Sequence, residues 1–148
     1  MIDFDLFVKT QRLMWLKRLL YGERNIGWKL YFDHIFRTVG GRFVSLCNYD
    51  MKLLTVKAPI FYLEMLKAWQ DMESCRNFQE GKTNPIIFNN KNYLHKNKMI
   101  FHEELYKKNI YLVDHILNKN QIRPLAYFQN LGLCSDNIAK IWEMCNVI

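Results

Sequence analysis

The feature that most constrains the fold is a regular apolar stripe between Trp28 and Val39. Its members recur at the i, i+3, i+4, i+7 spacing of one helix face: Trp28, Tyr31, Phe32, Ile35, Phe36 and Val39. Lys29, Asp33 and Arg37 step by four along the opposite face, as a solvated ladder of charges would. A pair of glycines follows and is expected to end this helix and turn the chain.

Helical periodicity dominates the remaining sequence as well. A first helix is predicted from Phe4 to Tyr21, ended by Gly22 in a left-handed conformation. A short element is expected at 51–56, and further helices over 59–78, from 101 to a break near 109, and over 110–117, 124–132 and 136–145. The β-branched and aromatic segment 85–88 and the segment 92–96 predict a hairpin that turns at Asn89-Asn90.

These elements predict a mainly α fold, a compact bundle of about six helices with one small β-hairpin. The chain has 148 residues, half of them hydrophobic, which is enough for a true core in one domain or two packed sub-domains. A loop at 81–85 is the expected internal boundary. It separates 1–80 from 81–148, and we expect the two parts to pack as one unit.

Charge points to a polyanionic partner. The net charge is +7, and lysine and arginine displace counterions from phosphates, so nucleic acid is the simplest candidate. The alternative is codon bias, because the sequence is also rich in Asn, Ile, Tyr and Phe. No apolar run approaches the roughly 20 residues of a membrane span, and the N-terminus carries acids where a signal peptide has bases. We therefore expect an intracellular protein, nuclear or cytoplasmic, with no membrane partner.

Catalysis by this chain alone is not expected. Its acids are scattered, and the adjacent Glu103 and Glu104 would point about 100° apart on a helix. No Tyr- or Phe-X-Asp-Asp sequence, phosphate loop or nucleophile elbow is present, and the four histidines are isolated. The four cysteines form no CxxC pair, so reduced thiols are expected, with no metal or cofactor.

Basic residues gather in two regions. The first consists of Lys9, Arg12, Lys17, Arg18, Lys29, Arg37 and Arg42, and the second of Lys91, Lys96, Lys98, Lys107 and Lys108. A basic helix that carries Trp15 suits contact with a phosphate backbone together with stacking. Arg12 falls inside the apolar arc of its helix and must snorkel or pair. The alternative is a solvated face over a packed stripe.

Several segments also follow a family pattern in order and spacing. The first is K-x-x-x-x-x-W-x-x-R-L-L, from Lys9 to Leu20. The others are Trp28-Lys29, the helix end from Phe36 to Gly41, Cys47 to Asp50, Pro59 to Tyr62, Leu66, Trp69, Pro85 to Asn90, Phe101, Asn109-Ile110, Asp114, Leu125 and Phe128. Over nearly its whole length the chain thus resembles the region after the polymerase palm in LINE-type (non-LTR) retrotransposon reverse transcriptases. Asn109 departs from the usual glycine and is expected to strain or reshape the break there.

The resemblance implies a thumb-like helical part at 1–80 and a wrist-like part at 81–148 that grip template–primer nucleic acid. It also implies that the catalytic residues lie elsewhere, in the palm, fingers and endonuclease of a parent RNA-directed DNA polymerase. The expected partners are an RNA or RNA–DNA duplex and that palm and fingers. The contact residues are then Lys9, Arg12, Lys17, Arg18, Lys29, Arg37 and Arg42.

Two other interpretations stay open. The chain could be a protein-interaction or structural module, with Tyr93, Phe128 and Trp142 forming an exposed partner patch. It could also be a retroelement remnant without stable function, with a bare apolar face that causes aggregation.

Overall fold

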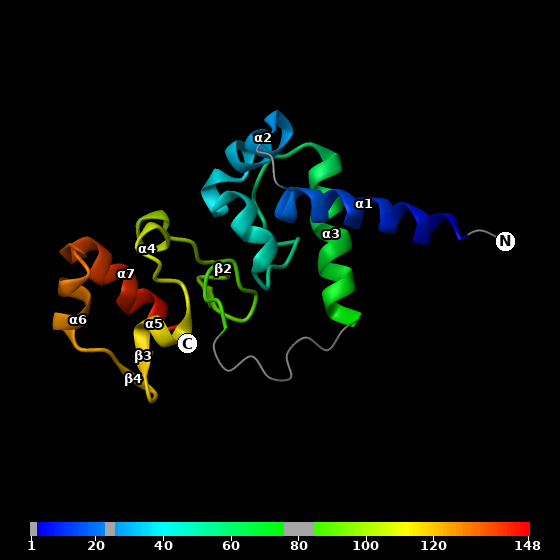
Figure 1. The fold of residues 1–148 in the computed structure, drawn as a ribbon. Coiled ribbons are helices and arrows are strands. Elements are labelled where there is room, and N and C mark those ends of the chain that lie inside the picture. The colour runs from blue at the N-terminus through cyan, green and yellow to red at the C-terminus, as the bar shows by residue number, and fades with distance from the viewer. Residues whose placement is uncertain (1–2, 23–25, 76–84) are drawn as a thin grey trace.

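The computed structural model describes residues 3–22, 26–75 and 85–148, with side chains at 73–75 left out. The described helices are α1 (Phe4–Tyr21), α2 (Gly27–Ile35), α3 (Ile60–Cys75), α4 (Glu103–Lys107), α5 (Val113–Ile116), α6 (Leu125–Asn130) and α7 (Ser135–Cys145), with the 3₁₀ helices η1 (Arg37–Val39) and η2 (Gly41–Leu46). Strands β1 (Leu94–His95) and β2 (Lys98–Met99) form one antiparallel hairpin, and β3 (Leu117–Asn118) and β4 (Gln121–Ile122) form another. The prediction of a mainly α fold is confirmed (Figure 1).

Helix α1 has the predicted bounds, and it begins where the Asp3 side chain accepts a hydrogen bond from the Leu6 N–H at 3.1 Å. The predicted left-handed end is wrong, because Gly22 has φ −70° and ψ 134°. A Cβ at Gly22 would collide with Lys29 Nζ and would lie 2.5 Å from the Arg18 carbonyl oxygen. Glycine is therefore needed here for space and not for a positive φ.

The predicted helix at 28–39 is α2 continued by η1. Phe32 and Phe36 are fully buried and stack with ring centroids 4.3 Å apart. Tyr31 was predicted to join them, but it is 49% exposed. The chain then turns through Gly40 and Gly41, which have φ +93° and +63° and so fulfil the prediction of a glycine turn.

The predicted pairing of 85–88 with 92–96 is wrong. Ile86 instead forms an isolated antiparallel bridge with Leu112, and the Ile87 N–H donates to the Tyr111 carbonyl at 2.8 Å. The hairpin forms further along, where Leu94 pairs with Met99. Ile87 and Phe88 are fully buried, so the backbone of this segment takes a partner distant in sequence.

The bounds of several other elements also differ from those predicted. The helix predicted at 110–117 is only α5, because the chain turns there into the unpredicted β3–β4 hairpin. No regular helix or strand forms at 51–56, which begins with a turn. Residues 76–78 of the predicted helix at 59–78, and 81–84 of the predicted boundary loop, lie outside the described residues. At the break near 109, Asn109 has φ +59°, a conformation that Asn tolerates better than most residues other than Gly.

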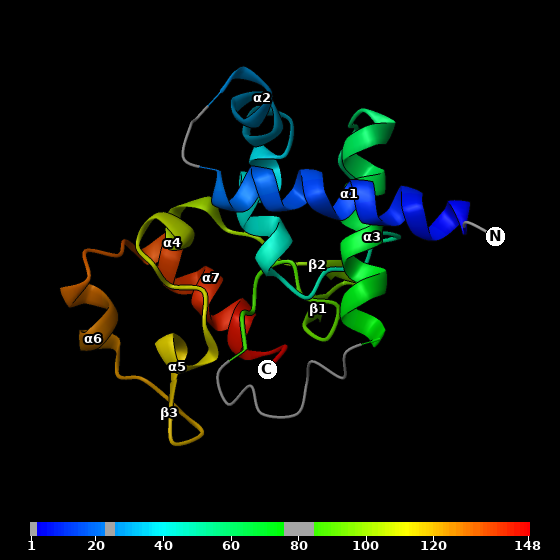
Figure 2. The same ribbon diagram turned by 45° about the vertical axis from the view of Figure 1, so that its right-hand side comes forward.

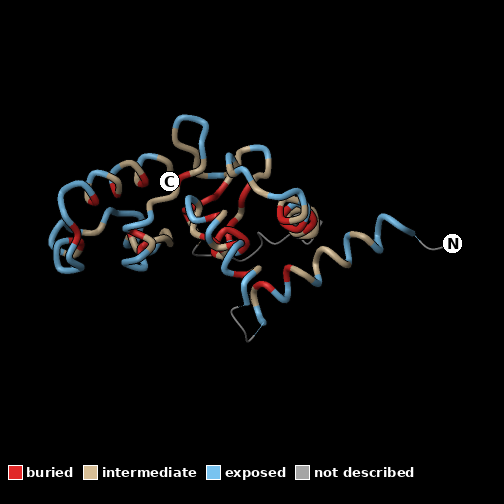
Figure 3. Tube along the Cα trace, turned by 90° about the horizontal axis from the view of Figure 1, so that it is seen from above, coloured by how far each residue is buried: buried red, intermediate tan, exposed pale blue. Residues whose placement is uncertain are grey.

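Two apolar clusters form the core. The first lies between α1, α2 and α3 and contains Leu16, Leu19, Phe32, Phe36, Val44, Tyr49, Tyr62, Met65 and Leu66. The second contains Phe43, Cys47, Ile87, Phe88, Ile100, Leu105, Ile110, Ile116, Phe128, Leu133, Ile141 and Met144. Neighbouring residues Phe43 and Val44 of η2 belong to different clusters, so η2 lies between them. Figure 2 shows the arrangement of the elements, and Figure 3 shows how far each residue is buried along the backbone. None of the described helices is long and apolar enough to cross a membrane.

Candidate nucleic-acid interface

The most prominent basic element is α1. Its C-terminal half crosses α3, whereas its N-terminal half extends beyond the rest of the molecule (Figures 1 and 2). Lys9, Lys17 and Arg18 are exposed on it, and the sequence from Leu6 to Tyr21 contains no acid. Asp5 lies in the first turn of α1, but from Leu6 to Tyr21 every charged side chain of the helix is basic, and this stretch attracts a polyanion.

Arg12 was predicted to snorkel or pair, and it pairs. Its Nη2 lies 2.5 Å from Glu64 Oε2 on α3, and its guanidinium carbon lies 4.9 Å from the centre of the Phe61 ring. Its Nε is buried and has no hydrogen-bond partner in the described part of the chain. Arg12 thus holds α1 against α3 and is poorly placed to meet a phosphate.

Trp15 fixes the same helix from the neighbouring side. Its ring meets those of Trp28 and Phe61 edge-on, with centroids 5.6 and 5.8 Å away. The exposed Arg18 guanidinium lies over Trp15 at 4.9 Å, a cation–π contact that orders the side chain and leaves its charge in solvent. The interpretation of Trp15 as an anchor beneath basic residues agrees with this geometry.

Lys29 is not part of an accessible surface. It is only 3% exposed, and its ammonium lies beside Gly22 at the C-terminal end of α1. Backbone carbonyls point out of a helix at that end, so a cation is favourable there. The expectation that Lys29 faces solvent is wrong because the end of α1 covers that face of α2.

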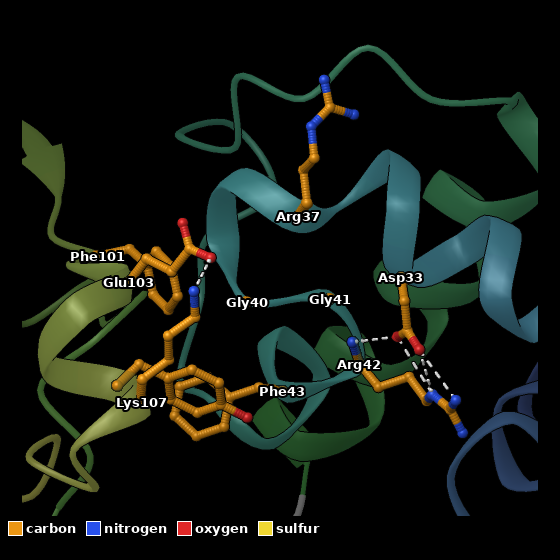
Figure 4. Close-up of a pocket in the computed structure, with 10 residues that line it drawn as sticks. Asp33, Arg37, Gly40, Gly41, Arg42, Phe43, Phe101, Glu103 and Lys107 are labelled. Carbon is orange, nitrogen blue, oxygen red and sulfur yellow. Dashed lines mark hydrogen bonds and ion pairs between the residues drawn. The ribbon is translucent and has the colours of Figure 1, made fainter.

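Arg37 and Arg42 lie around a hollow of about 390 Å³ between η1, η2 and α4 (Figure 4). Arg42 is committed to Asp33 by an ion pair of 2.9 Å and a backbone hydrogen bond of 2.9 Å. Across the hollow, Lys107 pairs with Glu103 at 3.0 Å. Arg37 is exposed, has no carboxylate within ion-pair distance among the described residues, and donates to the His34 carbonyl at 2.9 Å.

The predicted contact residues consequently fall into two groups. Lys9, Lys17, Arg18 and Arg37 are exposed, three of them on α1, whereas Arg12 and Arg42 are partly buried in ion pairs and Lys29 is buried. The structure does not bring all of them onto one track. Sequence reasoning also did not single out Lys119, although a Lys-Asn pair occurs both there and at Lys96.

The titratable side chains form a separate group. His95 Nε2 and His102 Nε2 lie 3.4 and 3.7 Å from the two carboxylate oxygens of Glu143. Burial lowers the pKa of His102, although Glu143 opposes this, and burial raises the pKa of the Cys145 thiol. Within residues 3–22, 26–75 and 85–148, no three His, Cys, Asp or Glu side chains are arranged to hold a metal ion.

Of the three aromatic residues predicted to form a partner patch, only Trp142 is exposed. Phe128 is 2% exposed and belongs to the second cluster, so it cannot form a partner patch. Trp142 is 56% exposed, in line with that interpretation, while Tyr93 is partly buried. The α1 residues Phe4, Leu6, Phe7 and Met14 are exposed by 45% or more.

Comparison with known proteins gives no family for this chain. A scan against protein-family models found no match, and searches of the curated proteins and of the solved structures found none either. The resemblance to non-LTR reverse transcriptases stays a prediction drawn from the residues of the sequence.

Proposed function

We propose that this chain is a non-catalytic part of a non-LTR retrotransposon reverse transcriptase that grips template–primer nucleic acid through backbone contacts. In this proposal 1–80 is thumb-like, 81–148 is wrist-like, and the protein acts inside the cell. The observation that carries it is the projecting helix α1. Lys9, Lys17 and Arg18 are exposed on this helix, and it contains no acid between Leu6 and Tyr21. Contacts to phosphates position a duplex and tolerate any sequence, as such a role requires.

Rigid mounting of α1 supports the proposal. Leu16 and Leu19 are buried in the first cluster, and the Arg12–Glu64 pair and Trp15 hold the helix beside them. Cations on a fixed helix lose less conformational freedom on binding than cations on a loose segment. In the refined proposal, Lys9, Lys17, Arg18 and Arg37 contact phosphates, while Arg12, Lys29 and Arg42 maintain the frame.

Salt-dependent binding to an RNA–DNA duplex tests the proposal. We expect log affinity to fall linearly with log salt concentration, because binding releases counterions. Replacing Lys9, Lys17 and Arg18 together by Ala should weaken binding at least about tenfold at 0.1 M salt. The same replacement should reduce the slope by about 0.9 for each phosphate that is no longer neutralised. Fluorescence anisotropy with a labelled duplex of unrelated sequence measures both quantities.

A matched control removes the same charge elsewhere. Lys52, Lys57 and Lys67 are exposed, and their joint replacement by Ala leaves α1 unchanged. This control should retain most of the affinity. Failure of the unaltered chain to bind duplex at low salt, or equal decreases in affinity for both triple variants, would contradict the proposed grip.

The protein-interaction alternative is favoured most by the exposed apolar side chains of α1. Phe4 is 71% and Phe7 52% exposed, and a partner such as the palm and fingers of a parent polymerase would cover them. A partner pulled down in high salt after nuclease treatment, and released by Phe4→Ser and Phe7→Ser, would favour this function over duplex binding.

A further inference from the structure

The two hairpins share one local design. Each follows the pattern Leu-X-Lys-Asn-X-Met/Ile, from Leu94 to Met99 and from Leu117 to Ile122. The registers correspond, with Leu94 opposite Met99 and Leu117 opposite Ile122. The Lys-Asn pair is therefore the two-residue turn in both hairpins, and it is exposed in both.

Lysine is an unfavourable choice for the first turn position. The φ angles are +49° and +62° for Lys96 and Asn97, and +50° and +64° for Lys119 and Asn120. Hairpins with two such residues favour Asn-Gly, Asp-Gly or Gly-Gly, because positive φ brings Cβ close to the backbone carbonyl, which strains residues other than Gly, Asn and Asp. The same strained choice occurs at both tips.

The charges of the two turn lysines are not neutralised within the described part of the chain. Lys96 and Lys119 have no carboxylate within ion-pair distance among the described residues, and the sequences 85–102 and 115–135 contain no acid. Glu143, which approaches β1, faces His95 and His102. The tips therefore present uncompensated positive charge to solvent.

The bases of the hairpins are anchored. Met99 packs against the first apolar cluster and accepts a hydrogen bond from the Asp50 N–H at its sulfur, while Leu117 packs against the second cluster. The two-residue turns are short, and their ends are fixed by the β1–β2 and β3–β4 pairing. Each lysine is thus carried on a defined protrusion instead of a loose loop.

We propose that the Lys96-Asn97 and Lys119-Asn120 tips are phosphate-contacting points for a nucleic-acid backbone. This inference rests on the proposed function and adds a second contact region, in the wrist-like part, to that on α1. A lysine ammonium and an asparagine amide both donate hydrogen bonds to phosphate oxygens. A nucleic acid fits better than an anionic membrane, because the turn residues offer no apolar side chain to enter a bilayer.

Lys→Asn substitutions separate binding from folding. Asn tolerates positive φ better than Lys, so Lys96→Asn combined with Lys119→Asn removes two charges without adding strain. Thermal stability should be unchanged or raised. Affinity for an RNA–DNA duplex should fall roughly tenfold or more at 0.1 M salt, and the log–log salt slope should fall by about 1 to 2. A matched control is Lys52→Asn with Lys67→Gln, which removes the same charge at two other exposed lysines.

The possible outcomes are distinct. If the unaltered chain binds duplex and the hairpin variant keeps its affinity and slope, the tips are not contact points, although the grip by α1 stands. If the control variant loses as much affinity as the hairpin variant, the loss depends only on net charge, and the inference is overturned. Weaker binding to phosphatidylserine vesicles, with duplex binding intact, would assign the tips to a membrane and overturn it too. If the unaltered chain does not bind duplex, the proposed function fails and this inference fails with it.

Discussion

At the scale of single residues, burial decides what each cation can do. Lys9 and Lys29 have the same ammonium group, but Lys9 lies on the free part of α1 whereas Lys29 is enclosed against the end of that helix. Arg18 and Arg12 differ in the same way, since one lies over Trp15 in solvent and the other is paired with Glu64. Only the exposed member of each pair can exchange counterions for phosphate.

The close approach of Lys29 to Gly22 leads to a prediction about stability. In Gly22→Ala the new Cβ would meet the Lys29 ammonium and the Arg18 carbonyl, and the carbonyl belongs to the backbone and cannot step aside. We expect a decrease of about 1–2 kcal/mol in the free energy of unfolding, measured by urea denaturation. Gly27→Ala is the control, because no atom lies within 4 Å of its Cβ position and Ala favours a helix. A gain in stability for Gly22→Ala would show that the close approach is not restrictive.

At the scale of elements, long amphipathic patterns were predictable and short elements were not. Helices α3 and α7 were predicted closely because each repeats its apolar positions over several turns, whereas α1 was predicted to the residue although its apolar residues do not form one continuous stripe. The β3–β4 hairpin was not predicted, because strands of two residues are too short to show an alternating pattern. The exposure of Lys17 could be predicted from the helical periodicity of its own sequence. The burial of Lys29 depends on packing against the end of α1, and the sequence periodicity of α2 carries no information about that contact.

The start of α5 should make stability depend on pH. His115 Nδ1 accepts hydrogen bonds from the Tyr111 and Leu112 N–H groups, both at 3.2 Å, which requires that nitrogen to be unprotonated. Burial, with a smaller contribution from Arg123, lowers the pKa of His115, and burial likewise lowers that of His102. The unfolded chain therefore binds protons more readily, and stability falls as pH falls through the ordinary histidine value of about 6.5.

Thermal melts between about pH 7.5 and about pH 5 measure this effect. The double variant His102→Gln and His115→Gln has no imidazole at either position, so its melting temperature should depend less on pH than that of the unaltered chain. Each single variant should fall between the two. An identical pH dependence in the double variant would show that neither imidazole is linked to folding.

At the scale of the whole molecule, partly buried polar contacts join the regions on either side of residues 76–84. The Asn89 side-chain amide donates to the Val39 carbonyl at 2.8 Å, and within 85–148 the Asn89 N–H also donates to the Ile100 carbonyl at 2.8 Å. The Lys91 N–H donates to the Asn48 carbonyl at 2.9 Å. These hydrogen bonds, together with η2, which contributes residues to both apolar clusters, hold residues 85–148 against the region that carries α1.

Asn89→Ala should therefore destabilise the whole molecule. It leaves the partly buried Val39 carbonyl without this donor, which costs about 1 kcal/mol, and it places Ala at φ +47°, which costs about 1 kcal/mol more. Asn89→Gly is the matched control, because it removes the same hydrogen bond but tolerates the positive φ. Urea unfolding followed by tryptophan fluorescence and by far-UV circular dichroism should place Ala below Gly and Gly below the unaltered chain. If Asn89→Ala unfolds at the unaltered midpoint, Asn89 does not join the two regions, and the hairpin tips and α1 would need another connection to act on one nucleic acid.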